Sequence, residues 1–282
     1  MLSLTPAEAE AKRDQLVSNG FCVVPGVIHG EFLQELQQWT DHLLDTRPVP
    51  EKVKYQGSDF HFMTQRRFNA EGQPPQHADL VDPIVDRLVD WPEQSQACAM
   101  LGLEDRASDE TAIILSKPAG GPALYWHQDW MQWDSPASAT PWPTRIFLSY
   151  YMVDTTRENG CLRAIPGTHR KRIPLHDLLP NAHEGQIQAQ DESHPAFMDH
   201  PDAVDLPVKA GDLVINDARV LHSAWPNRSD RRRTLVLQWQ NVFRFPKPPS
   251  WWQGEVPDEI KNADPQASYP YNRTPGKYLR AF

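Results

Sequence analysis

Residues 125–130 read YWHQDW, and the rest of the chain can be interpreted outward from this stretch. It is short and rich in aromatic residues, which is typical of a β-strand. Because residues i and i+2 of a strand point to the same face, His127 and Asp129 are expected to converge on one point. A histidine and a carboxylate arranged in this way can serve as two ligands of one metal ion.

A second histidine, His222, follows in the apolar run Val220-Leu221-His222. Two imidazoles and one carboxylate make a facial triad, which leaves the opposite face of an octahedral Fe(II) open for a cosubstrate and O₂. The same three ligand types also serve zinc hydrolases. The ligand set alone therefore leaves the metal open.

Arg233 stands shortly after His222, at the head of an apolar run that continues to Trp239. The turn-forming residues PNRSD (226–230) predict that this run folds back beside the strand of His222. Arg233 would then enter the same cavity, where a guanidinium can clamp a carboxylate such as the distal one of 2-oxoglutarate. Its neighbours Arg231 and Arg232 are interpreted as loop residues in solvent.

Strand-like runs recur after residue 110. Short stretches of β-branched and aromatic residues are separated by Pro, Gly, Asn and Asp, which is typical of a β-sandwich or barrel. Asn159-Gly160 predicts a type I′ hairpin turn. The fold class predicted is an all-β core with flanking helices (α+β), arranged as a double-stranded β-helix, or jelly roll, of the cupin type. Strands are expected within 111–117, 145–153, 161–165, 213–215 and 235–242.

The N-terminal part predicts helices. Thr5-Pro6 followed by Glu8 is a helix start, and apolar residues recur at helical spacing in 31–44. Further helices are expected within 82–91 and 95–103. We interpret 1–282 as a single domain with mainly helical support in 1–105, a jelly-roll core in 106–245 with an insert at 173–207, and a tail in 246–282. The tail is rich in proline and aromatic residues and is expected to pack on the domain or across a dimer contact.

Composition restricts the partners. The net charge of −9 and the pI of about 5.6 argue against nucleic acid or an anionic membrane. No apolar run approaches the roughly 20 residues of a membrane span, and no signal-peptide pattern is visible. Three widely spaced cysteines favour a reducing compartment. We expect a cytoplasmic protein with a small-molecule substrate, whose oligomeric state, a homodimer included, stays open.

Four blocks of sequence between about residues 110 and 240 carry a resemblance to a known family. They are WHQDW (126–130), ENGCLRAIPGTH (158–169), KAGDLV (209–214) and the stretch from His222 to Arg233. In this order they resemble the Fe(II)/2-oxoglutarate-dependent oxygenases of the phytanoyl-CoA dioxygenase (PhyH-like) family. The resemblance implies the jelly-roll fold, with Fe(II), 2-oxoglutarate and O₂ as cofactors.

The resemblance also implies a role for each matched residue. His127, Asp129 and His222 take the iron-ligand positions, Arg233 pairs with the 2-oxoglutarate carboxylate, and Gln128 contacts the cosubstrate. Side-chain alternation opposes the last of these, because it places Gln128 on the face opposite His127. In halogenating relatives a small residue replaces the carboxylate ligand, so Asp129 argues against halogenation.

Candidate substrate contacts come from residues near the ligands. Trp130 and Trp133 follow the ligand strand and are the expected substrate wall, while Asp217 and Arg219 are candidates for polar substrate contacts. The loops that we expect to rim the cavity are 45–78, 130–144 and 173–207, the first of them as a long irregular connection. The histidines of the last loop are expected in solvent; they are His176, His183, His194 and His200.

The function expected is that of a non-haem Fe(II)/2-oxoglutarate-dependent dioxygenase, which hydroxylates a small organic metabolite and releases succinate and CO₂. Desaturation, epoxidation, ring formation and endoperoxidation stay open. Two other classes also stay open. A zinc or other metal-dependent hydrolase could use the same triad, although it would not need Arg233. A non-catalytic cupin-like binding protein would keep the barrel, although the intact ligand set argues against it.

Overall fold

The computed structural model describes residues 2, 4–49, 54–64, 80–179, 193–243 and 245–264. The strands are β1 (Phe21–Val24), β2 (Asp59–Thr64), β3 (Leu80–Val81), β4 (Ala107–Lys117), β5 (Leu124–His127), β6 (Arg145–Tyr151), β7 (Leu162–Ala164), β8 (Val204–Leu206), β9 (Leu213–Asp217), β10 (His222–Ala224) and β11 (Arg233–Asn241). They form a seven-stranded sheet in the order β1-β9-β6-β11-β4-β2-β3 and a four-stranded sheet in the order β5-β10-β7-β8.

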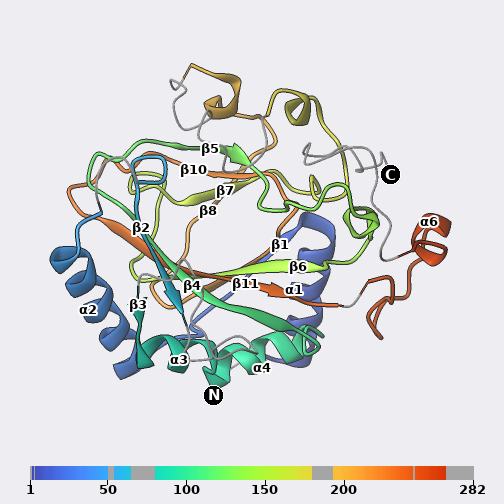
Figure 1. Ribbon diagram of the computed structural model, residues 1–282, viewed down its shortest axis with the longest axis horizontal. Coiled ribbons are helices and arrows are strands. Elements are labelled where there is room, and N and C mark those ends of the chain that lie inside the picture. The colour runs from blue at the N-terminus through green and yellow to red at the C-terminus, as the bar shows by residue number, and fades with distance from the viewer. Residues whose placement is uncertain are drawn as a thin grey trace.

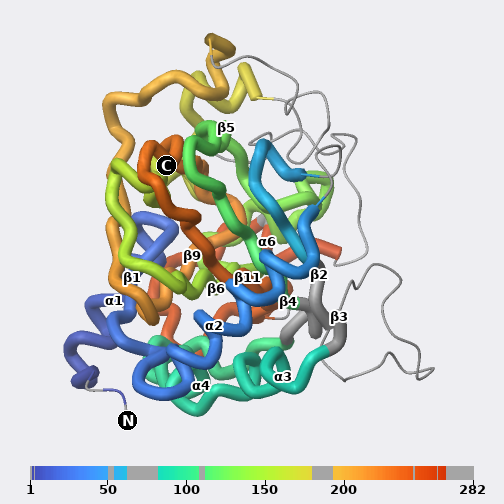
Figure 2. The backbone as a smooth tube through the Cα atoms, turned by 90° about the vertical axis from the view of Figure 1, so that its left-hand side faces the viewer, coloured from blue at the N-terminus to red at the C-terminus, as the bar shows by residue number. Residues whose placement is uncertain are grey.

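The helices lie mainly on one side of the large sheet. In the described ranges they are α1 (Pro6–Asn19), α2 (Gly30–Thr46), α3 (Pro83–Val89), α4 (Pro92–Met100) and the short α6 (Asp258–Lys261), and 3₁₀ turns lie at Pro136–Ala139, Pro174–Asp177 and Pro195–Phe197. Figure 1 shows the small sheet above the large one, the helices α3 and α4 beneath the large sheet, and α2 at its lower left. Figure 2, turned by 90°, again places α3 and α4 below β4, β6 and β11. Within the described ranges, no helix combines the length and the apolar character that crossing a membrane requires.

The path of the chain from β4 to β11 identifies the fold. β4, β6, β9 and β11 belong to the large sheet, whereas β5, β7, β8 and β10 belong to the small one, so the chain passes back and forth between the two. Every pairing among these eight strands is antiparallel. This arrangement is a double-stranded β-helix with flanking helices, and it confirms the predicted fold class.

Alternation along the strands separates the core from the site. On β6, Ile146 and Leu148 point to the helix layer and are buried in the main apolar core, together with Leu36 of α2 and Leu88 of α3. The intervening side chains of β6 point the other way, into the space between the two sheets. Apolar burial against the helices therefore stabilises one face of the large sheet and leaves the opposite face for a ligand.

The first helix begins where the sequence predicts. Thr5 is its N-cap in a capping box with Glu8, and Pro6 stands at the first helical position. The helix ends at Gly20, whose φ of 88° is left-handed and whose added Cβ would lie 2.7 Å from Nδ1 of His169. Glycine at this position lets the chain turn directly into β1, which pairs with β9.

The prediction of an irregular connection over residues 45–78 is wrong for the part that the structure describes. α2 continues to Thr46, and β2 (Asp59–Thr64) pairs antiparallel with β4, with Phe60 opposite Leu115. The run DFHFMT (59–64) supplies the hydrogen-bonding partner that the edge of β4 requires. Residues 50–53 and 65–79 lie outside the described residues, and so does much of this expected cavity rim.

The predicted hairpin at Asn159-Gly160 is also wrong. The flanking strands β6 and β7 belong to different sheets, and Gln56 is the one residue other than glycine with a positive φ in the described ranges, so Asn159 lacks the left-handed conformation that a type I′ turn needs. Its side chain instead accepts from Thr156 N and donates to Asp154 O. Gly160 is needed for a close approach, because its Cβ would lie 2.8 Å from Trp225 O.

The expectation that the histidines of the insert are solvent-exposed is wrong for His176. Its side chain is buried, and burial lowers the pKa of its imidazole to about 4. Nδ1 accepts a hydrogen bond from Ile173 N, which fixes the 3₁₀ turn at Pro174–Asp177. His194 and His200 are half-buried, and each accepts from a backbone N–H two residues ahead. His183 lies outside the described residues.

The described part of the tail, 245–264, packs on the rest of the protein. Trp251 donates its indole N–H to Gly102 O at 2.9 Å, and Trp252 makes an edge contact with Trp142 at 5.8 Å between ring centroids. Burial of these rings is the physical reason for a tail with so many aromatic residues. Residues 265–282 lie outside the described residues.

Candidate active site

The three side chains predicted as metal ligands lie together between the two sheets. Nε2 of His127 is 3.4 Å from Oδ1 of Asp129, and Nε2 of His222 is 3.8 Å from the same oxygen. One ligand atom from each residue lies within 4.8 Å of the other two, and all three side chains are buried. Strand pairing brings them together, because His127 ends β5 and lies directly opposite His222 at the start of β10.

The orientation of the two imidazoles fits a bound metal ion. Nδ1 of His127 lies 2.9 Å from Tyr125 O, and Nδ1 of His222 lies 3.1 Å from Val220 O. Because a carbonyl only accepts, each Nδ1 carries the proton and each Nε2 keeps its lone pair for a metal. Two ligands at right angles with bonds of about 2.1 Å lie about 3 Å apart, so a small contraction suffices for facial coordination.

The carboxylate oxygen of Asp129 that does not face the histidines also has a hydrogen-bond donor. Trp239 donates its indole N–H to Oδ2 of Asp129 at 3.2 Å. The sequence analysis did not assign a role to Trp239. Alternation from Arg233 along β11 could have found it, because residues 233, 235, 237 and 239 share one face of the strand.

These residues line one cavity of about 410 Å³ between the sheets. That volume lies in the range of small-molecule sites, about 300 to 1,000 Å³. The large sheet contributes alternate residues of four neighbouring strands to its wall. The lining side chains are Tyr55, Ser58, Phe60, Ile113, Leu115, Lys117, Leu124, His127, Asp129, Met131, Arg145, Phe147, Ser149, Tyr151, Leu162, His222, Ala224, Arg233, Leu235, Leu237 and Trp239.

Arg233 lies at one end of this cavity. It is the first residue of β11, opposite Lys117 on β4, and its guanidinium carbon lies 5.8 Å from the ring centroid of Tyr151. Burial lowers the pKa of the guanidinium, but an arginine stays protonated in proteins. Its Nε is buried and has no hydrogen-bond partner among the described residues. A buried cation with an unsatisfied N–H is suited to an anionic ligand such as a carboxylate.

Gln128 points away from the cavity, as strand alternation predicts. Its Nε2 donates to the carbonyl of Arg219, and two residues further on the backbone N–H of Trp130 donates to Ala218 O at 2.8 Å. Gln128 is absent from the cavity wall. Its visible role is to join the ligand segment 127–130 to the turn that leads into His222.

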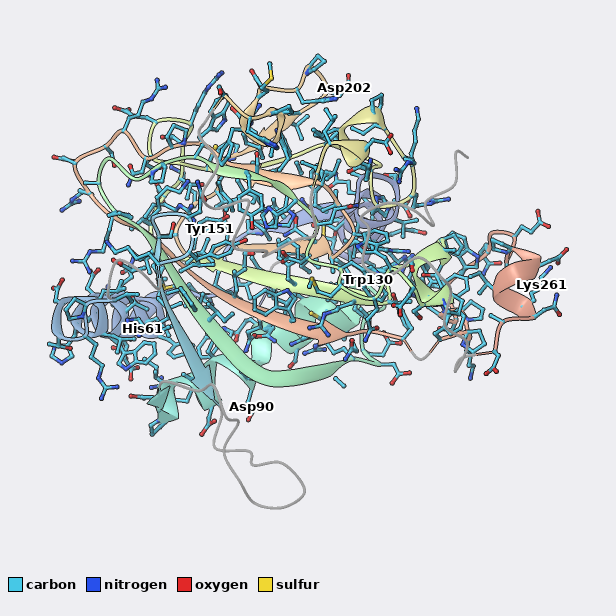
Figure 3. All side chains as sticks on the ribbon, turned by 45° about the horizontal axis from the view of Figure 1, so that its top comes forward. His61, Asp90, Trp130, Tyr151, Asp202 and Lys261 are labelled. Carbon is cyan, nitrogen blue, oxygen red and sulfur yellow. The ribbon has the colours of Figure 1, made fainter. Side chains whose placement is uncertain are left out.

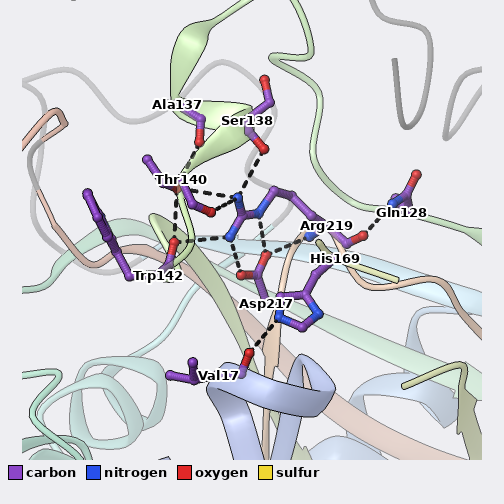
Figure 4. A network of polar contacts seen from close by, with 9 residues as sticks. All are labelled: Val17, Gln128, Ala137, Ser138, Thr140, Trp142, His169, Asp217 and Arg219. Carbon is purple, nitrogen blue, oxygen red and sulfur yellow. Dashed lines mark hydrogen bonds and ion pairs between the residues drawn. The ribbon is translucent and has the colours of Figure 1, made fainter. Parts of the chain in front are cut away.

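Asp217 and Arg219 form a buried network away from the cavity (Figure 4). Arg219 donates to both carboxylate oxygens of Asp217, through Nε at 2.9 Å and Nη2 at 2.6 Å. The remaining guanidinium N–H groups reach three backbone carbonyls, those of Ser138, Thr140 and Trp142. The predicted polar substrate contacts are thus corrected, because both side chains are already satisfied by the scaffold.

Trp130 and Trp133 do not line the cavity either. They pack with Ala137 and Ala218 in a separate buried cluster. Figure 3 shows Trp130 apart from Tyr151, toward the side of the molecule where Lys261 lies. The expected substrate wall is corrected for a physical reason. β5 ends at His127, so strand alternation does not extend to 130–133, and the two indoles bury in the core while Met131 lines the cavity instead.

Comparison with known proteins shows the family of the chain. The sequence profile of the phytanoyl-CoA dioxygenase (PhyH) family matches residues 16–235. An ectoine dioxygenase of Bordetella parapertussis is 26% identical over 201 residues, which cover 64% of this chain and 61% of that relative. The chain spans between 50% and 61% of the length of the first three curated relatives.

Solved structures share the fold. The epimerase SnoN from nogalamycin biosynthesis, in complex with Fe³⁺, alpha ketoglutarate and nogalamycin RO, superposes with a TM-score of 0.58 at 20% identity, covering 95% of this chain and 97% of that one. HygX from Streptomyces hygroscopicus, with nickel, 2-oxoglutarate and hygromycin B bound, gives 0.59 at 14% identity, covering 96% and 99%. Such low identities show the fold alone, whereas the family profile extends over most of the sequence. By that match, the chain belongs to the phytanoyl-CoA dioxygenase (PhyH) family.

Proposed function

We propose that this protein is a non-haem Fe(II)/2-oxoglutarate-dependent dioxygenase that hydroxylates a small organic molecule, with succinate and CO₂ as coproducts. One observation carries the proposal: His127, Asp129, His222 and Arg233 line the same cavity. A metal-dependent hydrolase would use the first three residues but would have no use for a buried guanidinium at the end of the cavity. That alternative is therefore not favoured.

Each of these residues has a defined task in the proposal. His127 and His222 bind the metal through Nε2, and Asp129 binds it through Oδ1. Arg233 holds the distal carboxylate of 2-oxoglutarate and so orients the keto acid toward the metal. The iron and the cosubstrate, when bound, supply the oxidising chemistry. The protein positions the reactants and excludes water by enclosing them between the two sheets.

The wall beyond the ligands supports an organic substrate with apolar surface. Phe60 of β2, Met131 and Trp239 of β11 are among the residues that line the cavity. Aromatic and sulfur-containing side chains contact the apolar surface of small molecules favourably. A curated relative is named for ectoine, and a solved structure of the same fold holds hygromycin B; both are small organic molecules.

The metal ligands are tested by single substitutions. His127→Ala, Asp129→Ala and His222→Ala should each bind less than stoichiometric iron and form no succinate, while their circular dichroism spectra stay unchanged. His29→Ala is the matched control, because that histidine has a side chain 56% exposed on the surface. Full iron content and turnover in any one of the three variants would refute the ligand assignment.

The cosubstrate is tested without turnover. Anaerobic addition of 2-oxoglutarate to the Fe(II) protein should produce the weak visible charge-transfer band of a chelated keto acid. The same experiment separates the two enzyme classes. Absence of the band, together with activity under nitrogen, would favour a hydrolase.

A further inference from the structure

The two oxygens of the Asp129 carboxylate have different surroundings. Oδ1 faces both histidines, 3.4 Å from Nε2 of His127 and 3.8 Å from Nε2 of His222. Oδ2 accepts the indole N–H of Trp239 at 3.2 Å. One oxygen is thus directed toward the metal position and the other toward β11.

We propose that Trp239 is a positioning residue that holds Asp129 as a one-oxygen ligand of the iron; this inference rests on the proposed function. A donor bound to Oδ2 competes with bidentate coordination, because it engages the second oxygen that bidentate coordination would require. Monodentate coordination keeps the neighbouring coordination position open. A facial triad needs that position for its cosubstrate and O₂.

The fold supplies the rigidity that this role requires. Trp239 lies in β11, a central strand of the large sheet, directly opposite Phe147 on β6. The register of β11 against β6 is continuous through Trp239, and alternation with Arg233, Leu235 and Leu237 directs its side chain into the cavity. An indole also has only two side-chain torsions, so holding it in place costs little conformational entropy.

Phe147, the neighbour of Trp239 on β6, contacts a second metal ligand, His222. The ring of Phe147 lies 5.0 Å from that of His222, centroid to centroid. The Trp239–Phe147 pair therefore braces Asp129 through a hydrogen bond and His222 through ring packing. Arg233 begins the same strand, so β11 carries both the clamp for the cosubstrate and the support for a metal ligand.

The test measures metal binding in the absence of cosubstrate and turnover. Trp239→Phe keeps an aromatic ring but removes the N–H donor. We expect its affinity for Co(II), titrated against a competing chelator, to fall about tenfold or more, as is typical when a residue that orients a metal ligand is replaced. The visible absorption of the bound Co(II), which depends on coordination number, should also change.

A matched control and an isostere separate the hydrogen bond from packing. Trp225→Phe removes another indole that donates to a carboxylate, that of Asp205 at 2.7 Å, outside the cavity. Its Co(II) affinity and spectrum should equal those of the wild type. Site-specific replacement of Trp239 by benzothienylalanine keeps the shape of the ring and removes only the N–H. It should reproduce the losses of Trp239→Phe, and wild-type values would overturn the proposal.

Failure of this inference is distinguishable from failure of the proposed function. Wild-type Co(II) affinity and an unchanged spectrum in Trp239→Phe would refute the positioning role while leaving the triad intact. Equal Co(II) affinity in the wild type and in His127→Ala would instead refute the metal site itself.

Discussion

Arg219 and Arg233 stand on either side of His222 in the sequence, and both are buried, but their surroundings differ. Arg219 shares two hydrogen bonds with the carboxylate of Asp217 and donates to three backbone carbonyls, so that none of its nitrogens lacks a partner. Arg233 faces the cavity, and its Nε has no hydrogen-bond partner among the described residues.

This contrast shows that burial alone does not separate a scaffold residue from a ligand-binding residue. For these two arginines, hydrogen-bond satisfaction together with position on the cavity wall does, because a buried polar group without a partner raises the free energy of the folded state unless a ligand supplies one. By this criterion Arg219 is a structural residue that stabilises the turn before His222. Arg233 can still bind an anionic ligand in the cavity.

The largest effect is expected from Arg219→Met. The substitution leaves the carboxylate of Asp217 buried without its cation, which should lower the free energy of unfolding by about 3 to 5 kcal/mol. Urea denaturation followed by fluorescence measures the change. The double variant Asp217→Asn with Arg219→Met should recover part of the loss, because it removes the unpaired charge. If Arg219→Met unfolded at the same urea concentration as the wild type, Arg219 would not stabilise the fold, and the contrast with Arg233 would be wrong.

A smaller effect, on binding rather than on stability, is expected from Arg233→Ala. Loss of a charge-assisted hydrogen bond worth roughly 1.5 to 3 kcal/mol should raise the 2-oxoglutarate dissociation constant at least about tenfold. The 2-oxoglutarate dissociation constant of Arg233→Lys should lie between those of the wild type and Arg233→Ala, because lysine keeps the charge but loses the bidentate geometry. The anaerobic absorption titration with Fe(II) protein measures both variants.

Arg232→Ala is the matched control for this prediction. Arg232 is the neighbouring residue, partly exposed and paired with Asp45 at the surface. Its removal should leave the 2-oxoglutarate dissociation constant unchanged. Equal constants in the wild type and Arg233→Ala would place the distal carboxylate elsewhere.

The smallest effect is expected from Gln128→Met. It removes the side-chain donor to the carbonyl of Arg219 and should lower the free energy of unfolding by about 1 kcal/mol. The 2-oxoglutarate dissociation constant should not change, because Gln128 does not line the cavity. A tenfold rise in that constant would instead support the cosubstrate contact that the family resemblance implies.

The sequence predicted the parts of the site that depend on spacing along one strand or across one turn. His127 and Asp129 converge at the predicted two-residue spacing, although β5 ends at His127. Arg233 follows the turn after His222 and faces the same cavity, but the predicted pairing of its strand with that of His222 is wrong, because β11 pairs with β4 and β6 in the large sheet whereas β10 belongs to the small one. The sequence did not separate Trp130 and Trp133 from Met131 and Trp239, because an aromatic residue near a motif can either pack in the core or face a ligand. The hairpin at Asn159-Gly160 failed for a related reason. A glycine that allows close approach to another segment has the same local pattern as a glycine in a tight turn.

By itself, the sequence determined the alternating strands, the ligand set and the helix start at Thr5, because periodicity and capping depend on neighbouring residues. The tertiary structure decided which polar groups have partners, since those partners lie far away in the chain. Arg219 is satisfied by carbonyls of residues 138–142, and Asp129 is held by Trp239. Strand pairing across two sheets brings such groups together, and no local pattern encodes that pairing.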